Sequence, residues 1–115
     1  MEAKSKRSWT LETARAILDE VRRHTESAVG EVEPLLAERE RAAEDTPERR
    51  EVDSRIQRRI SVWIRSMEAL GLEVKGLWLV DFDNGSGYYC WRWPEERIEW
   101  YHGHDEGHAD RVRIQ

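Results

Sequence analysis

The sequence predicts an α+β domain in which long antiparallel N-terminal helices pack on a small C-terminal antiparallel β-meander of three or four strands. The part before Gly71 is highly charged and repeats apolar residues at helical spacing. The part after Gly71 holds most of the tryptophans, all three tyrosines and the only phenylalanine. This second part alternates apolar and polar residues between glycine- and proline-containing turns, a pattern typical of strands.

The chain length of 115 residues suits one domain rather than two. We expect residues 1–7 to form a disordered basic tail and residues 8–115 to form the domain. Within that domain the helical half should cover residues 10–71 and the β half residues 75–115.

The first helix should begin after Thr10, whose hydroxyl can accept a hydrogen bond from an unpaired backbone N–H. Apolar residues then recur on one helical face: Leu11, Ala14, Leu18 and Val21. We expect this helix to end near residues 28–30 and Pro34 to start another amphipathic segment. The helical half is therefore either a hairpin or a three-helix layer.

The last helix should begin at Thr46-Pro47, a capping residue followed by proline, and end at Gly71. Its apolar stripe has near-heptad spacing and comprises Val52, Ile56, Ile60, Trp63, Met67 and Leu70. So long a stripe can belong to the core or to a seam between two chains, and we expect a homodimer formed through the helices.

Three alternating segments predict the sheet. The expected strands cover residues 77–82, 88–93 and 98–102, and residues 111–115 are a candidate edge strand. Pairing Phe82 with Tyr88, and Trp93 with Ile98, places the apolar side chains on one face. That inner face would hold Leu77, Leu79, Trp91, Trp93, Ile98 and Trp100, so Trp91, Trp93 and Trp100 are the expected core tryptophans. Asp81, Tyr89 and His102 would continue it at one end.

A carboxylate, a phenol and an imidazole are thus expected to lie close together at one end of the tryptophan-rich face of the sheet. The following loop adds His104, Asp105 and His108. These groups are common ligands of zinc, iron or manganese, the candidate cofactors here. The candidate ligands are Asp81, His102 and Asp105, with His104 and His108 as further ones. A hydrogen-bonded His102 and a solvated loop would explain the same residues, and Cys90 is expected on the opposite face as a structural thiol.

Composition narrows the partners and the compartment. The net charge is −5 and neither half is strongly basic, which disfavours nucleic acid. The single cysteine cannot form an internal disulfide, which favours a reducing compartment such as the cytoplasm. No run of about 20 apolar residues is present, so no membrane partner is expected. The composition points to no particular small-molecule ligand.

Several short stretches resemble one family. They are Trp9-Thr10-Leu11-Glu12, Leu79-Val80-Asp81-Phe82, Cys90-Trp91-Arg92-Trp93, and Trp100-Tyr101-His102 followed by Asp105, Gly107 and Arg111. The chain resembles the bacterial and archaeal domain of unknown function 2203 family over residues 8 to 114. The resemblance implies that Asp81, Cys90, Trp91, Glu95, His102, Asp105, Gly107 and Arg111 occupy characteristic positions, and it adds Arg111 to the candidate site. Tyr101, His104, His108 and Asp110 depart from the family pattern.

No activity is assigned to that family, so the resemblance strengthens the fold without implying a reaction. Two classes of function stay open. One is a structural or interaction module that self-associates through its helices. The other is a small metal-binding protein or metal-dependent enzyme with its site around Asp81, His102 and Asp105.

Overall fold

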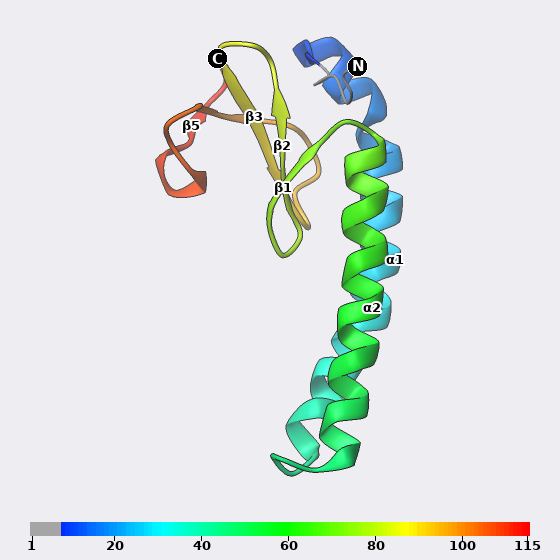
Figure 1. Cartoon of the computed structure of the whole chain (residues 1–115). Helices are drawn as coiled ribbons and strands as arrows, with labels where there is room; N and C mark the ends of the chain where they lie inside the picture. The colour runs from blue at the N-terminus through cyan, green and yellow to red at the C-terminus, as the bar shows by residue number, and fades with distance from the viewer. Residues whose placement is uncertain (1–7) are drawn as a thin grey trace, which may run out of the picture.

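A helical hairpin is followed by a five-stranded antiparallel sheet, which confirms the predicted fold class (Figure 1). The structure, a computed structural model, describes residues 8–115, and the predicted tail lies outside these described residues. The helices are α1 (Leu11–Arg41) and α2 (Pro47–Ala69). The strands are β1 (Glu73–Gly76), β2 (Leu79–Asp83), β3 (Gly87–Arg92), β4 (Trp100–Gly103) and β5 (Val112–Arg113), and a short 3₁₀ helix, η1 (His108–Asp110), precedes β5.

Helix α1 begins where predicted but runs further. The Thr10 hydroxyl accepts a hydrogen bond of 3.0 Å from the backbone N–H three residues later. The predicted break was wrong, because the helix continues through Gly30 and Pro34 to Arg41. Val32 in this stretch is buried in a cluster with apolar residues of α2. That packing outweighs the poor helix propensity of glycine and proline, so the helical half is a hairpin.

Helix α2 has the predicted ends. The Thr46 hydroxyl accepts from the backbone N–H of Arg49, and Gly71 has the positive φ of 94° that a helix-terminating glycine adopts. The N–H of Leu72 donates to the Met67 carbonyl at 3.1 Å, which closes the terminal motif. Four stripe residues are buried, namely Val52, Ile56, Trp63 and Met67. The stripe is therefore used largely inside the chain.

The sheet is a simple meander in which each strand pairs with the next. Strand β1 was not predicted, and the two-residue loop Leu77-Trp78 connects it to β2. The short edge strand β5 was predicted. The helices cover one face of the sheet at the open end of the hairpin, and the hairpin extends well beyond it (Figure 1).

The predicted strand registers were both wrong by one residue. Asp83, not Phe82, pairs with Tyr88, and Tyr88, not Tyr89, pairs with His102. Directly paired residues share a face of the sheet. The helix-facing side therefore carries Val80, Phe82 and Trp91. The outer face carries Leu79, Asp81, Asp83, Tyr88, Cys90, Trp100 and His102.

The core lies between the sheet and the helices. Trp91 is fully buried there, and its indole N–H donates to the Glu95 carbonyl at 2.9 Å. Trp93 is partly buried against the same core. Trp100 was wrongly placed in this core, because it lies on the outer face, where the guanidinium groups of Arg111 and Arg113 stack at 4.6 and 4.8 Å from its ring centroid. Among the described residues, no helix combines the length and apolarity needed to cross a membrane.

Candidate metal centre

Three neighbouring strands bring a carboxylate, a thiol and an imidazole together on the outer face. Asp81 lies on β2, Cys90 opposite it on β3, and His102 on β4. One ligand-type atom from each side chain lies within 4.8 Å of the others. The exposed fractions of the three residues are 1%, 0% and 2%. The cluster is therefore interior, although the face that carries it points away from the helices.

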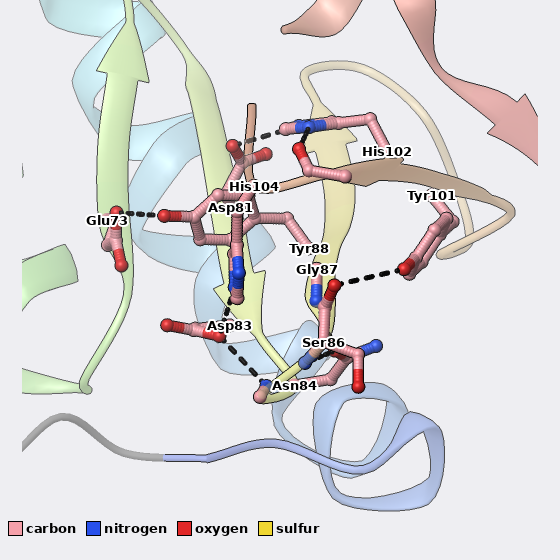
Figure 2. A network of polar contacts seen from close by, with 12 residues as sticks. Glu73, Asp81, Asp83, Asn84, Ser86, Gly87, Tyr88, Tyr101, His102 and His104 are labelled. Atoms are coloured by element: carbon pink, nitrogen blue, oxygen red, sulfur yellow. Dashed lines mark hydrogen bonds and ion pairs between the residues drawn. The ribbon is translucent and has the colours of Figure 1, made fainter. Parts of the chain in front are cut away.

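Asp81 and His102 are in hydrogen-bond contact. The ring Nδ1 of His102 lies 3.0 Å from the Gly103 carbonyl oxygen, and because a carbonyl can only accept, Nδ1 carries a hydrogen. The ring Nε2 lies 3.0 Å from Asp81 Oδ2 (Figure 2). A hydrogen bond there needs one proton, on the ring or on the carboxyl group. The orientation presents Nε2 to the carboxylate and the thiol.

Burial dominates the electrostatics of Asp81. It raises the pKa of the carboxyl group above its ordinary value, although the neighbouring His102 and Lys75 act in the opposite direction. The Lys75 ammonium lies 4.0 Å from Oδ2. Oδ1 is buried and has no hydrogen-bond partner among the described residues. The nearby Cys90 thiol is only a weak donor.

Cys90 is a thiol and not a thiolate in this environment. Burial, followed by the negative charge of Asp81, raises its pKa to about 12, and Arg111 counteracts this only in part. A Cys nucleophile needs a lowered pKa, so the environment does not favour nucleophilic chemistry at this sulfur. Direct coordination to a cation would ionise the thiol.

Charged and aromatic side chains cover the cluster. Arg111 reaches back from the segment before β5, with Nη1 3.9 Å from the Cys90 sulfur and Nη2 2.7 Å from Glu95 Oε2. On the other side, Lys75 lies over the Tyr88 ring at 4.5 Å. The Tyr88 hydroxyl donates to Glu73 Oε1 at 3.0 Å (Figure 2). These contacts explain why an outward-facing site is shielded from water.

A second Asp–His pair lies next to the cluster. Asp83 Oδ1 is 2.9 Å from His104 Nε2 and also accepts the backbone N–H of Gly85. The Tyr88 ring separates this pair from the buried one (Figure 2). Its centroid is 5.3 Å from the His102 ring and 4.8 Å from the His104 ring.

The predicted site residues separate into two groups. Asp81 and His102 meet, and Arg111 contacts the cluster through Cys90. Tyr89 lies on the helix-facing side, opposite Phe82, and Asp105 is exposed in the loop after β4. These two residues are therefore not part of the cluster.

His104 pairs with Asp83 outside the cluster. His108 also lies outside it, in η1, where burial and Arg111 lower its pKa. Its Nε2 is buried with no hydrogen-bond partner among the described residues.

Sequence reasoning missed Cys90, Tyr88 and Lys75 as neighbours of the Asp81–His102 pair. Cys90 and Tyr88 were assigned to the wrong pairings by the one-residue register error. The family pattern did contain a signal for Cys90, because the cysteine falls on one of its characteristic positions. Lys75 lies on the unpredicted strand β1, and nothing in the local sequence indicated its contact with Asp81.

Fold and site together define a small α+β protein with a buried Asp–Cys–His cluster on the outer face of a five-stranded meander. The chain belongs to the family described as uncharacterized conserved protein (DUF2203), whose model matches residues 7–114. No curated protein and no solved structure matches the chain. The family assignment from the sequence is thus confirmed.

Proposed function

We propose that this protein binds one divalent transition-metal ion through the Asp81 carboxylate, the Cys90 thiolate and the His102 imidazole. The observation that carries the proposal is the convergence of three ligand types from three strands within 4.8 Å of one another in the interior. Buried polar groups normally have hydrogen-bond partners, and Asp81 Oδ1 has none among the described residues. A cation would satisfy that oxygen.

The donor set favours zinc among the metals that the sequence left open. Thiolate sulfur selects zinc and iron, whereas manganese prefers oxygen ligands. The hydrogen bond from His102 Nδ1 to the Gly103 carbonyl is the outer-shell contact that orients a metal-bound histidine. Three protein ligands leave one tetrahedral position for water or a substrate, the arrangement of catalytic zinc sites. A metal-dependent enzyme is therefore one form of this proposal.

Metal binding at this cluster would release protons. One would leave the Cys90 thiol, and a second would leave the His102–Asp81 hydrogen bond, while the hydrogen on Nδ1 stays on the ring and continues to be donated to the Gly103 carbonyl. Protons therefore compete with the metal, and the affinity should fall as the pH is lowered. A cluster with a purely structural, hydrogen-bonding role would bind no metal, so it would show no pH-dependent metal affinity.

The test is metal analysis of the untagged full chain, followed by titration of the metal-free protein with Co²⁺. We expect one equivalent of metal, and absorption in the near ultraviolet from charge transfer between the thiolate and cobalt. Cys90→Ser should remove that absorption, and His102→Gln should weaken binding by about 10–100-fold or more.

His24→Gln is the matched control, because His24 is an exposed histidine beside Glu20 on α1. It should bind cobalt like the wild type. A wild-type protein that gives no thiolate–cobalt absorption at millimolar metal would refute the proposal. Equal binding by wild type and Cys90→Ser would refute the role of Cys90.

The second candidate function is a structural module that self-associates through its helices. It is supported by the length of the hairpin beyond the sheet (Figure 1) and by two large apolar side chains that the helices leave exposed. Leu36 on α1 and Val62 on α2 keep 40% and 44% of their surface accessible. Burial of such residues against a second copy would remove apolar area from water.

A further inference from the structure

The cluster is the inner member of two stacked Asp–His pairs. Side chains two residues apart on a strand share a face, so Asp83 repeats the position of Asp81 along β2. His104 follows His102 by two residues, in the turn directly after the end of β4 at Gly103. The inner pair is separated by 3.0 Å and the outer pair by 2.9 Å. Figure 2 shows both pairs with the Tyr88 ring between them.

The two pairs differ in their access to solvent. The inner side chains are each 2% exposed, whereas the outer His104 and Asp83 side chains are 40% and 15% exposed. An ion destined for the inner cluster must therefore first meet groups at the surface. The outer pair offers an imidazole and a carboxylate there, which are ordinary metal ligands.

The two other carboxylates near the cluster, Glu73 and Glu95, are already paired with Lys75 and Arg111. Lys75 lies 4.0 Å from Asp81 and Arg111 lies 3.9 Å from the Cys90 sulfur, so the cluster has a positive charge close on two sides. The outer pair, in contrast, presents the negatively charged carboxylate of Asp83 to an approaching cation. Residues two positions apart along a strand are about 6.6 Å apart, a short step for an ion leaving one pair for the other.

We propose that Asp83 and His104 form a surface capture site, which binds the divalent ion from solvent and transfers it past Tyr88 to the inner cluster. This inference rests on the proposed function. Two protein ligands completed by water give weak binding, which suits a transfer site. The three inner ligands, including a thiolate, give the tighter final site.

The first experiment measures the rate at which metal-free full chain gains thiolate–cobalt absorption after mixing with Co²⁺. For the double variant Asp83→Asn/His104→Gln we expect a rate about tenfold lower than wild type, with the same final absorption. The control is Glu20→Gln/His24→Gln, which removes a similar exposed acid–histidine pair on α1. This control should react at the wild-type rate. Equal rates for all three proteins, or equal slowing by both variants, would overturn the capture site.

The second experiment examines the outer pair when the inner cluster lacks its thiol. In Cys90→Ser protein, Mn²⁺ should broaden the NMR signals of the His104 ring at concentrations that leave the exposed His24 ring sharp. Equal broadening of the two rings would overturn the capture site even if the inner cluster binds metal. Conversely, selective His104 broadening with no thiolate–cobalt absorption in the wild type would refute the proposed inner site. That result would also refute the transfer of the ion from the outer pair, which would then be a surface metal site only.

Discussion

The two Asp–His pairs allow a comparison in which burial changes while the chemistry and the distance stay nearly the same. The inner pair, Asp81–His102, is separated by 3.0 Å with both side chains 2% exposed. The outer pair, Asp83–His104, is separated by 2.9 Å with exposed fractions of 15% and 40%. Breaking a buried pair costs about 3–5 kcal/mol, because the remaining group keeps its desolvation without its partner. Exposed pairs contribute about 0–1 kcal/mol.

We therefore expect Asp81→Asn or His102→Gln to lower the free energy of unfolding by about 3–5 kcal/mol. The same substitutions at Asp83 or His104 should lower it by about 1 kcal/mol or less. At about 4 °C per kcal/mol for a domain of this size, the inner variants should lose roughly 12–20 °C in Tm.

The assay is urea unfolding of metal-free protein with chelator present, because a bound ligand would add its own stabilisation. Double-mutant cycles for each pair separate the coupling from the cost of each substitution. The inner coupling should exceed the outer by about 2 kcal/mol. Couplings that agree within error would show that burial does not set the strength of these pairs, and would refute this reasoning.

Three further predictions concern the core, the thiol and the oligomeric state. Trp91→Ala should cost about 3–5 kcal/mol in urea unfolding, because it removes a fully buried indole; an unchanged midpoint would remove Trp91 from the core. The pKa of Cys90 is raised from 9.0 to about 12, so the folded state holds the thiol proton more tightly than the unfolded state. Stability from this group is present below pH 9 and is lost as the pH rises towards 12. Between about pH 8 and about pH 10, wild type should lose about 1.4 kcal/mol more than Cys90→Ala, and parallel losses would contradict the shift. The homodimer predicted from the helix stripe stays a prediction, which light scattering tests by looking for twice the 13.7 kDa mass of one chain.

Local signals were enough to place the helix ends. Thr10 and Thr46 cap the helices because a hydroxyl at that position satisfies an unpaired N–H of the first turn. Gly71 ends α2 because it adopts the positive φ that the terminal motif requires. The predicted break near Pro34 failed because it depended on propensity alone, which packing between the two helices overrides.

The site was predicted in part, through two errors that cancelled. Each one-residue slip moves a strand's side chains to the opposite face. The slip between β2 and β3 and the slip between β3 and β4 together return Asp81 and His102 to a common face. Only the residues of the middle strand β3 were assigned to the wrong face. Tyr89 was therefore predicted on the face of Asp81 and His102, which Tyr88 and Cys90 in fact share.

The sequence by itself determined the α+β class, the helix caps, the order of a helical half before a β half, and the alternation of side chains along each strand. These features depend on residues close in sequence or on the two-residue period of a strand. Tertiary structure alone decided the registers, the burial of the cluster and the approach of Lys75 from β1 and of Arg111 from the segment before β5. The register depends on how each turn closes and on which face packs against the helices. Burial and long-range contacts depend on elements that local sequence patterns do not position relative to one another.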